Sequence, residues 1–132
     1  MVRAEGVDAA IGEWRKLAGE SPNDGSIHNS IGDLHLKRNA VSEAIAAFLQ
    51  AAAGFRSEGA TLKAIATYKK ILKVDPTRYE VYRHLGDLNA ERGLLSSAVQ
   101  DYLTLGKYYL NNLIGNPLDS TIAVASLVFG GV

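Results

Sequence analysis

Residues 45–78 read IAAFLQAAAGFRSEGATLKAIATYKKILKVDPTR, and this stretch decides the fold. Its small residues let two helix axes approach closely, and its aromatic residues fill the space between neighbouring hairpins. Gly59 suits the left-handed residue that ends a helix, and Pro76 falls in a link between helices. The stretch therefore predicts two helices, over 42–57 and 60–74, joined by a short turn.

The same pattern recurs further along the chain at a spacing of 34 residues. The matched pairs are Phe48 with Tyr82, Ala52 with Gly86, Gly59 with Gly93, Ala64 with Ala98, Tyr68 with Tyr102 and Ile71 with Leu105. At a second spacing, of 54 residues, Ile31-Gly32-Asp33-Leu34 matches Leu85-Gly86-Asp87-Leu88. Such a period is typical of helical repeat proteins, whose stacked hairpins bury apolar faces that one hairpin alone would expose.

The repeated unit resembles the tetratricopeptide-repeat family over about residues 8–110. The residues that carry the resemblance are Phe48, Ala51-Ala52, Phe55, Gly59, Ala64, Tyr68, Ile71 and Pro76. The resemblance implies an all-α, right-handed helical solenoid of about six antiparallel helices. It also implies a scaffold that binds other proteins and catalyses no reaction. Helix 42–57 is both the last helix of one repeat and the first helix of the next. Because two repeats share this helix, we expect the path of the solenoid to change there.

We expect six helices, near 7–19, 26–38, 42–57, 60–74, 78–91 and 95–113. Gly32, Ala52 and Gly86 are the expected points of close helix approach, and Trp14, Phe48, Tyr68 and Tyr102 are the expected packing residues. Asn39, Gly59 and Gly93 are expected to end helices in the left-handed conformation. Thr77 and Glu80 have the spacing of a capping box for the fifth helix.

The chain divides into a repeat domain, residues 1–113, and an apolar C-terminal tail, residues 114–132. From Tyr108 onward the only charged side chain is Asp119, and Ile122–Phe129 is apolar and rich in β-branched residues. A soluble protein normally covers such a segment, and an exposed one is adhesive. The tail therefore either docks on the repeat domain or contacts another molecule.

Composition excludes several classes of function. Lys plus Arg and Asp plus Glu both number 14, so no overall positive field favours nucleic acid. The chain has no cysteine, which excludes disulfides and thiolate zinc sites and fits a reducing compartment. The first residues lack the apolar core of a secretion signal, and no run reaches the length that spans a bilayer. We interpret the chain as a cytoplasmic protein without a membrane span.

The resemblance implies that a partner binds in a concave groove lined by the first helix of each repeat. The groove residues by register are Asn29, Asp33, Lys37, Leu49, Gln50, Ala53, Arg56, Arg83, Asp87 and Glu91. Asp33 and Asp87 stand where some members of the family place residues that bind a terminal carboxylate, and they would repel that anion. We therefore expect no clamp for a chaperone tail, and each of these residues can also be only a solvated polar side chain.

We interpret the other candidate residues mainly as structural residues. His28 and His35 share one helical face but occupy positions that the repeat fills with bulky residues, so we interpret both as packing residues and expect no metal site. Lys63, Lys69, Lys70 and Lys73 make helix 60–74 basic. That helix is either a solvated face or a surface for an acidic partner, and we favour the solvated face.

We find no glycine-rich phosphate loop, nucleophile-elbow pattern or cofactor motif, so we expect no enzyme and no cofactor. The first hypothesis is a scaffold that binds a peptide or helix of another protein in the groove. The alternative is a self-assembling structural protein that uses its uncapped ends and apolar tail to form a homo-oligomer or filament. The half repeat at residues 8–22 also suggests a fragment of a longer protein.

Overall fold

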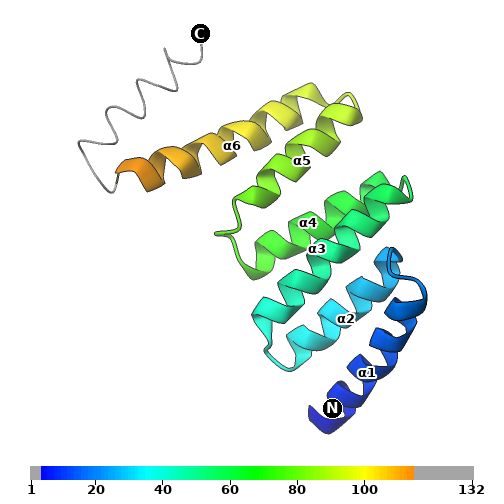
Figure 1. Ribbon diagram of the computed structural model, residues 1–132. Helices are drawn as coiled ribbons and strands as arrows, with labels where there is room; N and C mark the ends of the chain where they lie inside the picture. Colours follow the sequence, from blue (N-terminus) through cyan, green and yellow to red (C-terminus); the bar gives the residue numbers. More distant parts are fainter. Residues whose placement is uncertain (1–3, 115–132) are drawn as a thin grey trace. The chain divides into compact units, whose positions relative to one another are not determined.

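The computed structural model describes residues 4–114, which form six helices and no strand (Figure 1). The helices are α1 (Ala4–Glu20), α2 (Gly25–Lys37), α3 (Val41–Ser57), α4 (Thr61–Val74), α5 (Glu80–Glu91) and α6 (Leu95–Ile114). The all-α prediction is confirmed, and each expected helix end lies within one turn of the observed end. Residues 115–132 of the predicted apolar tail lie outside the described residues.

The described helices fall into two compact units. The first unit ends at Arg78 and contains α1 to α4, and the second begins at Tyr79 and contains α5 and α6. None of the helices within residues 4–114 is long and apolar enough to cross a membrane.

In the first unit α2 and α3 are the inner helices, because α2 packs against α1 and α3, and α3 packs against α2 and α4. The sequence dictates the position of α3, since this helix carries small or aromatic residues around most of its circumference. Its buried members include Ala44, Ile45, Phe48, Ala51, Ala52 and Phe55. One helix therefore serves two hairpins, as the overlap of the two repeats at residues 42–57 predicted.

The contact between α2 and α3 depends on the absence of a side chain at Gly32. A Cβ atom at that position would overlap the ring of Phe48, which is fully buried. The glycine thus lets the two helix axes approach until the phenyl ring fills the space between them. The expected close approach at Gly32 is confirmed, and Phe48 and Tyr68 are buried packing residues as expected.

The turns between hairpin helices follow the predicted chemistry. Asn39, Gly59 and Gly93 have φ values of 60°, 78° and 77°, so all three end helices in the left-handed conformation. At the start of α2, the carboxylate of Asp24 accepts a hydrogen bond from the backbone N–H of Ser26 at 2.9 Å. This bond satisfies one of the N–H groups that a helix start leaves without a partner.

The predicted capping box of Thr77 and Glu80 is wrong. The backbone N–H and the hydroxyl of Thr77 both donate to Oδ1 of Asp75, at 3.0 and 2.5 Å. Asp75 thus accepts from the Thr77 N–H that would donate to the Glu80 carboxylate in a capping box, and it forms a local turn before the helix begins. These hydrogen bonds lower the pKa of Asp75, and α5 begins after Tyr79 without a side-chain cap.

In the second unit α5 packs against α6. Val81, Leu85 and Leu88 of α5 are buried, and so is Ala98 of α6. The ring of Tyr102 lies against Gly86, where a Cβ atom would approach the ring to 2.5 Å. Gly86 is therefore a point of close helix approach, as predicted.

The predicted packing role of Tyr102 is only partly correct. One side of its ring contacts Gly86, but the side chain remains 39% exposed. Its hydroxyl donates to Oδ1 of Asp87 at 2.5 Å. A tyrosine side chain has an apolar ring and a polar hydroxyl. At the edge of a hairpin the ring can pack against the partner helix while the hydroxyl keeps a hydrogen bond.

Candidate functional site

A hollow of about 450 Å³ opens on the first unit between α2 and α4. We call it the α2–α4 groove. Its lining residues are Ser26, Asn29, Ser30, Phe55, Lys63, Ala66, Thr67 and Lys70. The two flanking helices lie on the same side of α3, which contributes Phe55. The volume falls within the range of about 300–1,000 Å³ that is common for ligand-binding clefts.

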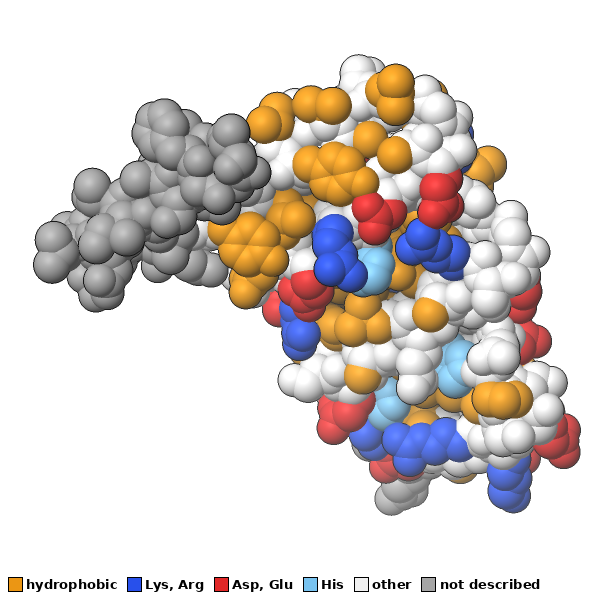
Figure 2. Space-filling view, turned by 45° about the horizontal axis from the view of Figure 1, so that its top comes forward, with side chains coloured by type: hydrophobic (Ala, Val, Ile, Leu, Met, Phe, Trp, Pro, Cys, Tyr) orange, Lys and Arg blue, Asp and Glu red, His pale blue; other side chains and the backbone are white. Residues whose placement is uncertain are grey.

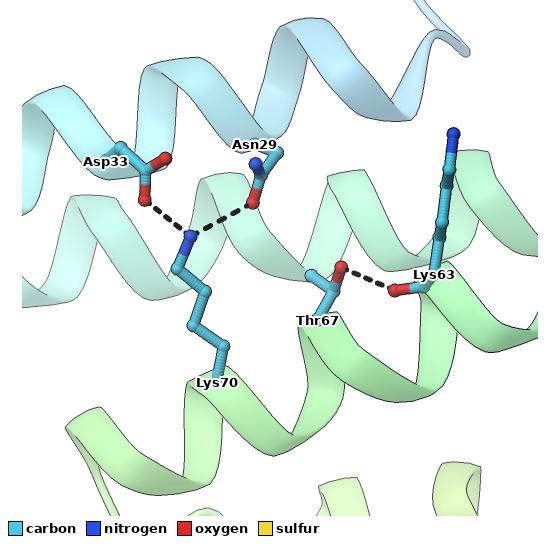
Figure 3. A network of polar contacts seen from close by, with 5 residues as sticks. All are labelled: Asn29, Asp33, Lys63, Thr67 and Lys70. Carbon is cyan, nitrogen blue, oxygen red and sulfur yellow. Dashed lines mark hydrogen bonds and ion pairs between the residues drawn. The ribbon is translucent and has the colours of Figure 1, made fainter.

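Lys70 joins the two sides of the groove (Figure 3). Its ammonium donates to Oδ1 of Asp33 at 2.5 Å and to Oδ1 of Asn29 at 3.3 Å. The same ammonium lies 4.5 Å from the centre of the Phe48 ring. These contacts cross from α4 to α2, so they fix the spacing of the groove walls and offset the charge of Asp33. The interpretation of Lys70 as a plain solvated residue is wrong.

Lys63 precedes Lys70 by about two helical turns and lies on the same wall of the groove. Its ammonium lies 5.8 Å from the centre of the Phe55 ring, and its side chain forms no ion pair with any other residue in 4–114. The hydroxyl of Thr67 donates to the backbone carbonyl of Lys63 at 2.8 Å and is thereby used within α4 (Figure 3). Lys63 is therefore the cation of the groove that is available to a ligand.

A second hollow, of about 300 Å³, lies between α1 and α3 over α2. Its lining residues are Arg15, Ala18, His28, Ile31, His35, Glu43, Ala46, Ala47 and Gln50. His28 and His35 are both buried, which confirms that they are packing residues. Nε2 of His28 lies 2.7 Å from the carbonyl oxygen of Pro22 and donates to it, because a carbonyl can only accept.

His35 is buried with Nδ1 lacking a hydrogen-bond partner in the described part of the chain. Burial lowers its pKa below the usual value, and the nearby charges of Arg38 and Arg15 add to this effect. The imidazole is therefore neutral near neutral pH. No group of three His, Cys, Asp or Glu side chains within residues 4–114 is arranged to hold a metal ion.

The structure places only part of the predicted groove set at the α2–α4 groove. Asn29 lines it and Asp33 lies beside it, and both bind Lys70. Gln50 instead lines the hollow between α1 and α3. Lys37 on α2 and Ala53 on α3 are exposed, while Leu49 and Arg56 on α3 are half-buried. Arg83, Asp87 and Glu91 lie on α5 in the second unit, and their role as groove residues stays a prediction.

The sequence analysis missed the contribution of α4 to the groove. Family register treats helix 60–74 as the second helix of its repeat, which faces away from a concave surface. Because α3 is shared by two hairpins, α4 instead lies next to α2. One signal was present: Lys63, Ala66, Thr67 and Lys70 have the spacing of a single helical face.

The family model described as tetratricopeptide repeat matches residues 2–60. Over these residues the chain is similar to tetratricopeptide repeats, in agreement with the resemblance found in the sequence. This region contains α1, α2 and α3, and the α4 wall of the groove follows directly after it. Tetratricopeptide repeats support a role as a protein-interaction scaffold.

Two solved structures with a similar arrangement of helices are reported for comparison. One, titled "Crystal structure of MamA", has 18% sequence identity and a TM-score of 0.47, and the match covers 81% of this chain and 71% of that chain. The other, titled "Crystal structure of MamA protein", has 19% identity and a TM-score of 0.44, with 77% and 63% covered. No curated protein matches the chain.

Proposed function

We propose that the chain is a non-catalytic scaffold that binds a segment of another protein, a peptide or a helix, in the α2–α4 groove. The observation that carries this proposal is the hollow of about 450 Å³ between two helices of the repeat unit. The groove is preformed by helix packing, so a ligand would bind without first ordering its walls.

The chemistry of the walls suits a polypeptide ligand. Ser26, Ser30 and Asn29 offer hydroxyl and amide groups to a peptide backbone. The exposed Ala66, beside the largely buried ring of Phe55, offers apolar surface to a side chain. Lys70 is already engaged with Asn29 and Asp33, which keeps the walls in place. The predicted groove residues Asn29 and Asp33 therefore belong to the proposed binding surface.

Two matched alanine substitutions test the proposal. Ala66 lines the α2–α4 groove and Ala46 lines the hollow between α1 and α3, and both alanines are exposed on helices. We expect Ala66→Trp to fill the groove and to weaken, by at least about tenfold, the binding of peptides selected on the wild-type chain from a random display library. Ala46→Trp should leave their affinity unchanged. Selected peptides that respond to Ala46→Trp and not to Ala66→Trp would place binding on the opposite face and refute the proposal.

A second candidate function is self-assembly, and the exposed side of α6 favours it. Leu95, Val99 and Leu103 are 67%, 54% and 57% exposed and lie on one side of that helix. Exposed apolar side chains, coloured orange, are visible in Figure 2. Helical repeats bury such faces against a further unit of the same kind, so another copy of this chain is the candidate occupant.

A further inference from the structure

We infer that the α2–α4 groove selects a partner segment that carries an acidic side chain next to an apolar one. This inference rests on the proposed function and specifies the partner that the same groove would bind. It starts from the charges that line the hollow. Among residues 4–114, those that line the hollow include two lysines and no acidic residue.

The charge that remains for a ligand is positive. Asp33 is the acidic residue nearest to Lys70, and their side chains are paired at 2.5 Å, so these two charges offset each other. Lys63 has no such pairing among residues 4–114 and lies at the same groove. The exposed Lys69 and Lys73 add positive charge elsewhere on α4, a helix without an acidic residue. A basic segment would therefore meet repulsion here, and an acidic one attraction.

The hydrogen-bonding groups of the groove also favour an acidic ligand. A lysine ammonium can only donate, so the atom of Asn29 that faces Lys70 at 3.3 Å is its carbonyl oxygen. The amide nitrogen of Asn29 is then left as a donor in the groove. The hydroxyls of Ser26 and Ser30 can donate as well, since both residues line the same hollow. A carboxylate accepts several such bonds, and bonds to a charged acceptor are the stronger ones.

Phe55, whose side chain is only 6% exposed, forms the apolar floor of the groove. Its ring lies 5.8 Å from the ammonium of Lys63. If a ligand carboxylate binds Lys63, the neighbouring residue of the ligand therefore lies close to this floor. Ala66 adds a second apolar contact from α4. An acidic side chain with an apolar neighbour contacts both Lys63 and Ala66, whereas a purely acidic segment leaves the exposed apolar surface of Ala66 in water.

The test uses the full chain and a random peptide display library, selected on the wild type and counter-selected on the Ala66→Trp variant. We expect peptides that bind wild type and fail on Ala66→Trp to be enriched in Asp or Glu beside an apolar residue. Groove-dependent peptides without that enrichment, or enriched in Lys or Arg, would overturn the inference and leave the proposed function standing. If no selected peptide is sensitive to Ala66→Trp, both are overturned.

Substitutions that remove one charge from the peptide or from the chain then test whether Lys63 causes the preference for acidic peptides. In an enriched peptide, Glu→Gln should weaken binding to wild type by about tenfold, measured by fluorescence anisotropy. Lys63→Gln should abolish that difference between the Glu and Gln peptides. Lys69→Gln should preserve it, because Lys69 is an exposed lysine of the same helix that does not line the groove. An equal effect of both lysine variants would indicate unspecific charge attraction and would refute the role of Lys63.

Discussion

Asp33 shows how one distant contact alters the chemistry that a residue offers. By sequence alone, its carboxylate predicts repulsion of an anionic ligand. In the fold, Lys70 binds that carboxylate at 2.5 Å, although the two residues are 37 positions apart in the sequence. Because Asp33 and Lys70 are both partly exposed, the pair contributes only about 0–1 kcal/mol to stability. Its main effect is to offset the negative charge on the α2 wall.

His35 provides a pH-dependent prediction at the same scale. Its pKa in the folded chain lies below the value of 6.5 expected for the unfolded chain. Between those two values the unfolded chain binds more protons, so stability rises with pH in that interval. The neutral imidazole of His35 thus makes its full contribution to stability above about pH 6.5. That contribution is lost as the pH falls toward the pKa of His35 in the folded chain.

We therefore predict that His35→Leu flattens the dependence of stability on pH in mild acid. The free energy of unfolding of the wild type, measured with urea, should fall by up to about 1 kcal/mol more than that of the variant between about pH 7 and pH 5.5. At neutral pH the variant should lose little stability, because leucine also removes the Nδ1 atom that has no partner. Parallel pH profiles for the two proteins would contradict this explanation.

At the scale of the helices, the packing of α2 on α3 gives a matched pair of glycine variants. A Cβ atom at Gly32 overlaps the buried ring of Phe48, whereas a Cβ atom at Gly12 on α1 meets nothing within 4 Å. We predict that Gly32→Ala lowers the free energy of unfolding by about 1–3 kcal/mol. Gly12→Ala should raise it by about 0.5–1 kcal/mol, since alanine favours the helix and no neighbour has to move. Urea unfolding of both variants measures these changes, and a neutral Gly32→Ala would show that the helices can separate without cost.

The helices themselves could be predicted from the sequence, because their signals are local. Gly59 and Gly93 end helices where the repeat places them, and the overlap at residues 42–57 correctly predicted the shared helix α3. The capping box at Thr77 and Glu80 failed for an equally local reason, since Asp75 accepts from the Thr77 N–H that would donate to the Glu80 carboxylate in a capping box. Spacing alone does not show which of two nearby acceptors is occupied.

At the scale of the whole molecule, the candidate site was less predictable than the fold. Family register identified Asn29 and Asp33, but it placed the groove on the first helix of each repeat and so included no residue of α4. The contacts of Lys70 with α2 depend on how α3 is shared, and a single sequence contains no signal for a side-chain pair so far apart. The predicted residues on α5 lie in the second unit, so their participation remains to be tested by experiment.

The last prediction concerns the chain as a unit of assembly. If copies associate through α6, the mass measured by light scattering should rise above 14.1 kDa as the concentration increases. Leu103→Glu should then return the protein to a monomer, because it places a charge within the apolar side of α6. Leu62→Glu is the matched control, since Leu62 is 65% exposed on α4 in the first unit. It should behave like the wild type. A wild-type mass of 14.1 kDa at every concentration, or an equal effect of both substitutions, would exclude α6 as an interface between copies and leave the α2–α4 groove as the proposed interaction surface.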